Sequence, residues 1–240
     1  MEVYTSVVSF FQDGGVFMYP IVIVFTLGLA IAVERWVYLS KTSISNKVLW
    51  KKITPFIQAG KFTEAVNLTS KSKAAIGTIL TYGLHRIKQS ARRDDVEKAM
   101  EESLMEVMPR LEKRTHYLAT FANVATLLGL LGTIIGLINA FTAVAAANPA
   151  EKADMLSASI SVAMNTTAFG LMSAIPLLLF HAKLTSTTGQ IIDSLEMASV
   201  KALNTISNLN RFQFETKPDF SDETRQSPIG TAPASAGNPA

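Results

Sequence analysis

Three long apolar runs stand out in the pattern of hydrophobic and polar positions along the chain. They cover residues 16–38, 117–147 and 155–182, and none carries a charged residue well inside it. A helix needs about 20 residues to cross the hydrocarbon layer of a bilayer, which is ~30 Å thick. The pattern therefore predicts three transmembrane helices, of which the second is long enough to tilt or to continue into water.

The segments between and after these runs place apolar residues among charged ones with helical period. Residues 39–116 contain predicted helices at 61–69 and 75–89 and a longer one that begins at Asp94. We expect this longer helix to run without interruption into the second span, apart at most from a kink at Pro109. The helix at 75–89 has an apolar stripe formed by Ile76, Ile79, Leu80, Leu84 and Ile87. The stripe of the helix that begins at Asp94 is Val96, Met100, Leu104, Val107 and Leu111. A further amphipathic helix after the third span has the stripe Ile191, Leu195, Ala198, Ala202, Ile206 and Leu209.

Lysine and arginine are spread very unevenly around the spans. No basic residue precedes Arg35, whereas fifteen lie between Lys41 and Arg114, and only Lys152 lies between the second and third spans. Basic residues concentrate on the cytoplasmic side of membrane proteins. The sequence thus predicts an all-α integral membrane protein with three transmembrane helices and long cytoplasmic helical extensions.

This orientation assigns a side of the membrane to each remaining segment. We expect residues 1–15 to be periplasmic, 39–116 to be cytoplasmic, 148–154 to form a short periplasmic loop, and 183–215 to form a cytoplasmic amphipathic helix. The N-terminus lacks a basic region, so no cleavable signal peptide is expected. The tail, 216–240, is rich in Ser, Pro, Ala, Gly and Asn and is predicted to be disordered.

Composition excludes several classes of function. The chain has no cysteine, and its three histidines share no spacing typical of a metal site, so no metal or cofactor is expected. No P-loop, dinucleotide-binding turn or nucleophile elbow is present, which argues against an enzyme. The net charge of +3 is explained by the basic residues on the predicted cytoplasmic side of the membrane. No concentrated basic stripe with base-reading chemistry is present, so nucleic-acid binding is not indicated.

The sequence LLGLLGTIIGLINAF, residues 127–141, combines an apolar span with closely spaced glycines. Gly132 and Gly136 form a G-x-x-x-G pair, which lets a neighbouring membrane helix approach closely. We expect Gly129 in the same run and Gly170 in the third span to be helix-packing positions as well. For Gly132 and Gly136, packing is favoured over gating.

Hydroxyl and amide side chains interrupt the second and third spans at membrane depth. They are Thr133 in the second span and Asn165, Thr166 and Thr167 in the third. Lipid offers such groups no partner, so they must face protein or water, and they indicate a pathway for a small charged species. Local explanations compete with this one: a threonine hydroxyl often binds a carbonyl one turn earlier, and Asn165 is equally explained as a contact between helices.

These two spans resemble the MotA/TolQ/ExbB proton-channel family, most closely its three-span TolQ/ExbB branch. The resemblance rests on LLGLLGTIIGLINAF followed by TTAFGLMSAIP at 166–176. The sequences ERW at 34–36, GKFTEA at 60–65 and EKR at 112–114 also fit. It extends over roughly residues 15–210.

The resemblance implies a bacterial inner-membrane subunit that forms a homo-oligomeric ring, typically of five copies. Such a ring surrounds two copies of a single-span ExbD/TolR-like partner, whose membrane aspartate supplies the titrating carboxylate, and works with a TonB- or TolA-like transducer. Thr133 and Thr167 match the family's pore threonines, with Asn165 and Thr166 as neighbours on the ion path. The translocated species is then H⁺ or Na⁺, and the work is TonB-dependent uptake or Tol-type envelope maintenance.

Two positions depart from the family pattern. Many members have a proline where this chain has Thr126, and ExbB-type sequences often have a glutamate where it has Val162. The missing carboxylate leaves the coupling ion open, because oxygens of Asn165 and Thr166 suit a hard cation such as Na⁺. The resemblance itself favours protons.

Two hypotheses of different class follow. The first is a ring-forming subunit of an ion-driven motor or channel, which needs a partner that carries a membrane carboxylate. The second is a non-conducting membrane scaffold whose cytoplasmic helices recruit a partner through the charges at 90–114. Substitutions of Thr133 and Thr167 are damaging under the first hypothesis and silent under the second.

Overall fold

The computed structural model describes residues 14–89 and 92–215 of the 240-residue chain. These residues form six helices and no strand. The helices are α2 (Met18–Gln58), α3 (Phe62–Ser70), α4 (Ala75–Gln89), α5 (Arg93–Glu112), α6 (Thr115–Ala146) and α7 (Lys152–Glu215). The predicted all-α fold is confirmed. The predictions for residues 1–13 and for the tail at 216–240 fall outside the described residues.

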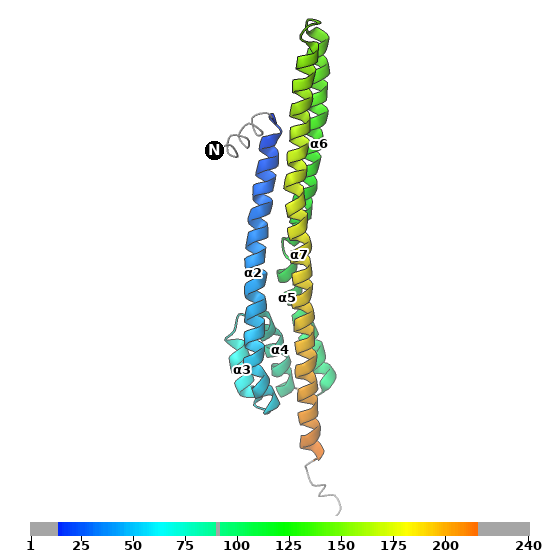
Figure 1. Ribbon diagram of the computed structural model, residues 1–240. Helices are drawn as coiled ribbons and strands as arrows, with labels where there is room; N and C mark the ends of the chain where they lie inside the picture. Colours follow the sequence, from blue (N-terminus) through cyan, green and yellow to red (C-terminus); the bar gives the residue numbers. More distant parts are fainter. Residues whose placement is uncertain (1–13, 90–91, 216–240) are drawn as a thin grey trace, which may run out of the picture.

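α6 and α7 form a long antiparallel hairpin, and α2 runs beside it (Figure 1). The short helices α3, α4 and α5 gather around the lower halves of α2 and α7 and form a wider helical bundle there. Three stretches are long and apolar enough to cross a membrane: Met18–Gln58, Arg93–Ala146 and Lys152–Leu209. This confirms three candidate membrane helices with long helical extensions.

The upper parts of α2, α6 and α7 expose large apolar side chains around much of their surface. Ile23 of α2, Leu127 and Ile138 of α6, and Leu179 of α7 are all more than half exposed in the single chain. In water such a surface would be strongly unfavourable. It fits helices that are surrounded by lipid and by other membrane helices.

The predicted apolar stripes form the core of the helical bundle. Ile79, Leu80 and Leu84 of α4 are fully buried, and Leu195 of α7 is fully buried against the same core. Most other stripe residues are buried as well: Ile76, Val96, Met100, Leu104, Val107, Leu111, Ile191, Ala198, Ala202 and Ile206. Helical period alone therefore identified which side chains hold the bundle together.

The expected continuous helix from Asp94 into the second span is wrong. The chain leaves helical geometry after Glu112, and Arg114 adopts the left-handed conformation with φ 66° before α6 begins at Thr115. Pro109 lies inside α5. Only Arg114, among described residues other than glycine, has positive φ. The break thus stores local strain, which other contacts must offset.

Candidate ion-pathway site

Two facing glycines bring α6 and α7 into backbone contact. A Cβ atom added to Gly129 would lie 3.2 Å from the Cα of Gly170. One added to Gly170 would lie 2.8 Å from the carbonyl oxygen of Ala125. No side chain fits at this distance without a shift of backbone, so the two glycines set the closest approach and the register of the hairpin.

The other two predicted packing glycines continue the same contact line toward the hairpin loop. A Cβ on Gly132 would overlap the methyl group of Thr166, and one on Gly136 would lie 2.9 Å from the Cβ of Ala163. All four glycines therefore lie against α7 or α6 and not against open space. This close seam places the polar residues of the two helices within reach of each other.

Thr133 of α6 and Thr167 of α7 meet one turn from the glycine contact. Their hydroxyl groups contact each other directly. The Thr167 hydroxyl donates to the carbonyl oxygen of Gly129 at 2.9 Å, and the Thr133 hydroxyl lies 3.2 Å from the same oxygen and 3.4 Å from the carbonyl oxygen of Ala163. Both side chains are half-buried. The two spans thus share one small polar cluster.

This cluster has more acceptor positions than hydrogens. Two hydroxyl groups supply two hydrogens and four lone pairs. Each hydrogen is donated to a backbone carbonyl or to the oxygen of the other hydroxyl, so at least three of the four lone pairs accept no hydrogen from within the cluster. The Thr133–Thr167 pair therefore presents oxygen acceptors to its surroundings, and such a surface suits a cation or a proton donor.

Thr166, next in sequence to Thr167, has a different environment. Its side chain is buried, and its hydroxyl lies 2.7 Å from the carbonyl oxygen of Gly14 and 2.9 Å from that of Val162. The residue fastens α7 to the turn before α2 while its methyl group covers Gly132. The structure therefore does not bring Thr166 into the Thr133–Thr167 cluster.

Asn165 lies on a polar stripe along α7 with Ser157 and Ser161. Ser157 and Ser161 are exposed in the single chain, and Asn165 is half-buried. Its amide makes no hydrogen bond to any described residue. The stripe is thus available to a neighbouring helix or to water, and the ion-pathway role of Asn165 and Thr166 stays a prediction.

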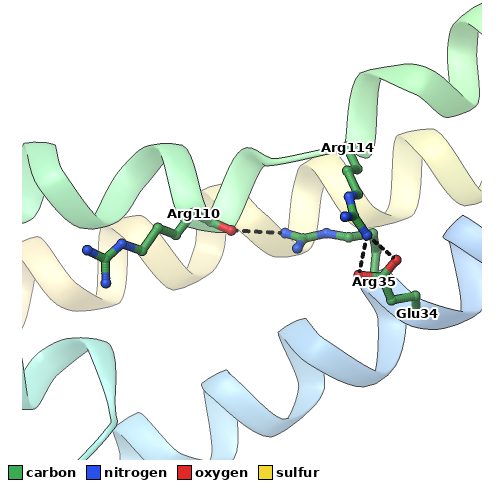
Figure 2. Close-up of polar contacts among 4 residues, drawn as sticks. All are labelled: Glu34, Arg35, Arg110 and Arg114. Carbon is green, nitrogen blue, oxygen red and sulfur yellow. Dashed lines mark hydrogen bonds and ion pairs between the residues drawn. The ribbon is translucent and has the colours of Figure 1, made fainter.

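A second polar cluster, which sequence reasoning missed, surrounds the break between α5 and α6 (Figure 2). The side chain of Arg35 of α2 is buried. Its Nη2 donates to the carbonyl oxygens of Leu111 and, at 3.4 Å, of Arg110, and its guanidinium lies 4.6 Å from the ring centre of Tyr38. The last carbonyls of a helix have no partner within it, so a cation is favourable there.

Glu34 and Arg114 complete this cluster on its exposed side. The Nη1 of Arg114 lies 2.9 and 3.1 Å from the two carboxylate oxygens of Glu34. Both side chains are about half exposed, so the pair contributes little by itself. A signal for the buried arginine was present: Arg35 shares the helical face of Ala32 and Leu39, which are fully buried.

The glycine contact leads to a testable prediction with a matched control in the same helix. Gly170→Ala should lower the free energy of unfolding by about 1–3 kcal/mol, because the new methyl group forces the backbones apart. Gly189→Ala meets nothing within 4 Å and should raise stability by about 0.5–1 kcal/mol through lower chain entropy. Thermal unfolding of the purified protein in detergent measures both. Equal stability of the two variants would contradict the close approach.

Comparison with known proteins identifies the class to which this fold and site belong. A family model described as the MotA/TolQ/ExbB proton channel family matches residues 71–197, more than half of the chain. The chain belongs to this family. It is accordingly a multi-pass inner-membrane protein of the proton-channel type with a role in envelope transport or the Tol–Pal system.

Individual relatives agree with this assignment. A putative biopolymer transport protein ExbB homolog of Methanothermobacter thermautotrophicus is 30% identical over 80% of this chain and 67% of its own length. A putative ExbB-like biopolymer transport protein of Synechocystis is 30% identical over 76% and 72% of the two chains. The Tol-Pal system protein TolQ of Haemophilus influenzae is 36% identical over 36% of this chain and 38% of its own. These names describe transport and Tol–Pal components and not enzymes.

Proposed function

We propose that the chain is the ring-forming subunit of a proton-driven motor or channel that transmits the ion-motive force to an envelope process. The Thr133–Thr167 cluster is the observation that carries this proposal. It combines hydroxyl groups from two antiparallel membrane helices and leaves most of their lone pairs available as acceptors. The two apolar runs that contribute these hydroxyls, 117–147 and 155–182, contain no Asp, Glu, Lys or Arg.

Because these two runs contain no carboxylate, another chain must supply one at the level of the threonine cluster. We infer a single-span ExbD/TolR-like partner with a membrane carboxylate, in two copies within a ring of five. The threonine oxygens would accept a hydrogen bond from that carboxyl group in its protonated form. A TonB- or TolA-like transducer then carries the motion to TonB-dependent uptake or to Tol-type envelope maintenance.

The energy source in this proposal is the ion gradient. One elementary charge that crosses the membrane releases about 2.3 kcal/mol per 100 mV. The proposed orientation has the N-terminus in the periplasm and the helical bundle and C-terminus in the cytoplasm, as the lysine and arginine distribution indicates. In this orientation the helical bundle lies on the cytoplasmic side, where protons that cross the membrane leave the protein.

A non-conducting scaffold is the second candidate, and a groove on the helical bundle favours it. The groove lies between α5 and α7, has a volume of about 230 Å³, and carries Glu97, Glu101 and Glu196 around an apolar floor. Such a surface suits recruitment of a partner. It is compatible with the motor as well, so the composition of the complex decides between the two.

Native mass spectrometry of the complex, extracted gently from its own membranes, tests the proposal. We expect five copies of this chain with two copies of a small single-span protein whose span contains an aspartate or glutamate. A homo-oligomer of another size without a light partner would contradict the motor and favour the scaffold.

A further inference from the structure

A cavity that is partly open to solvent, with polar side chains on an otherwise largely apolar wall, lies where α5 ends and α6 begins, against the side of α7. It has a volume of about 370 Å³ and is lined by Glu112, Thr115, His116, His181, Thr185 and Thr188, among others. His181, Thr185 and Thr188 share one face of α7 because they are spaced four and three residues apart. The cavity therefore brings ionisable and hydroxyl groups from three helices together.

Two hydroxyl groups on the wall of this cavity have no protein partner. Thr115 is 5% exposed and Thr188 is 4% exposed. The Oγ1 atom of each is buried without a hydrogen bond to any described residue. A buried hydroxyl without a partner is costly, and polar cavities of sufficient size hold ordered water that satisfies such groups. The two threonine hydroxyls are thus the groups that would bind water if this cavity is hydrated.

His181 has one ring nitrogen fixed by the backbone. Its Nδ1 lies 3.1 Å from the carbonyl oxygen of Thr115. A carbonyl oxygen only accepts hydrogen bonds, so Nδ1 carries the hydrogen and Nε2 of the neutral ring is a free acceptor. The site therefore holds a base whose tautomer and orientation are set by the first residue of α6.

The cavity is separate from the Thr133–Thr167 cluster. Thr167 and His181 are 14 residues apart in α7, which corresponds to about 21 Å along the helix axis. Between the two levels the contact of α6 with α7 is filled by buried apolar side chains, including Leu118, Ala122 and Leu177. Among the described residues no group of three or more His, Cys, Asp or Glu side chains is placed to hold a metal. Water and protons are the ligands that suit the cavity.

We propose that this cavity is a hydrated proton-transfer site at the cytoplasmic end of the membrane helices, with His181 as the proton acceptor. A proton reaches Nε2 through water held by the Thr115 and Thr188 hydroxyls and leaves from the same nitrogen toward Glu112 or bulk water, while Nδ1 keeps its hydrogen. The inference rests on the proposed function and deepens it, because a relay through an imidazole carries H⁺ and not Na⁺.

The charged groups around His181 fit this role. Glu112 of α5 and His116 of α6 are the other ionisable groups on the cavity wall. The two guanidinium groups at the α5–α6 break are engaged elsewhere: Arg35 of α2 binds helix-end carbonyls, and Arg114 pairs with Glu34. His181 and Glu112 thus share the cavity wall, while both guanidinium groups at the break have partners outside the cavity.

Proton flux into liposomes that contain the complete complex with its partner subunit tests the relay. We expect Thr188→Val and His181→Gln each to lower flux at least tenfold, and Thr188→Ser to retain it. Thr187→Val is the matched control, because its hydroxyl binds only the carbonyl of Lys183 in its own helix, at 2.8 Å. Wild-type flux in both Thr188→Val and His181→Gln would overturn the inference.

Two further readouts separate this inference from the proposed function. Solid-state ¹⁵N NMR of His181 should show contact with water and protonation of Nε2 on acidification, and the water contact should be lost in Thr188→Val. If the wild-type complex carries no flux but this signal is present, the motor fails and the hydrated site stands. If the His181 imidazole shows no contact with water and no protonation on acidification, and Thr188→Val unfolds at a higher temperature, the two hydroxyls are merely buried and the site is overturned.

Discussion

Replacement of Thr133 and Thr167 together by valine should abolish ion-driven work while leaving the ring assembled. Valine has nearly the shape of threonine, so the α6–α7 seam keeps its packing, but the free oxygen acceptors disappear. A neutral hydrogen bond contributes about 0.5–1.5 kcal/mol, so each lost acceptor should reduce flux about 2- to 10-fold, and loss of both should reduce it by up to about 100-fold. Liposome flux of the reconstituted complex measures this, and native mass spectrometry confirms that the oligomer is intact.

Two variants of the same helix make this result specific. Thr142 is exposed, and its hydroxyl binds only the carbonyl of Ile138 in its own helix, at 2.8 Å. Thr142→Val should therefore leave flux unchanged. Thr133→Ser should retain most of the wild-type flux, because the hydroxyl oxygen remains. A double valine variant with normal flux would remove the threonine cluster from the ion pathway and leave the scaffold as the better hypothesis.

Local periodicity was enough to predict the helices, but it did not predict the break between α5 and α6, where side chains from a distant part of the sequence make contacts. The stripes of α4, α5 and α7 repeat every three or four residues, so the buried faces could be identified before the fold was known. Nothing in Lys113 and Arg114 themselves predicts a break, since both are good helix formers. The break coincides with contacts from Glu34 and Arg35, which lie about eighty residues earlier in the chain.

The candidate site shows a similar limit. The sequence indicated that Thr133, Thr166 and Thr167 are polar groups at membrane depth, but it could not separate the last two. Neighbouring residues in a helix point about 100° apart, so only one of them can face Thr133. That choice depends on the register of the hairpin, which the contact of Gly129 with Gly170 sets.

Loss of the buried guanidinium at the α5–α6 break should be strongly destabilising. Arg35→Met keeps most of the side-chain volume but leaves the carbonyls of Arg110 and Leu111 without their donor. Because Leu111 is 1% exposed, water does not readily replace the lost bond. We expect the free energy of unfolding to fall by about 3 kcal/mol, the upper range for hydrogen bonds from a charged group.

The expected loss is larger than the gain from removing a buried charge, because two helix-end carbonyls lose their charged donor together with the guanidinium contact to the Tyr38 ring. Arg35→Lys keeps the charge but loses the planar guanidinium fork, so its stability should lie between those of the wild type and Arg35→Met. Arg110→Met is the matched control: its guanidinium is exposed and pairs only with Glu106, at 2.8 Å, so the change should stay within about 0.5 kcal/mol. Thermal unfolding in detergent measures the order of stability of these variants. Limited proteolysis should cut Arg35→Met between α5 and α6 faster than it cuts the wild type. Equal stability of Arg35→Met and Arg110→Met would show that the break holds without Arg35.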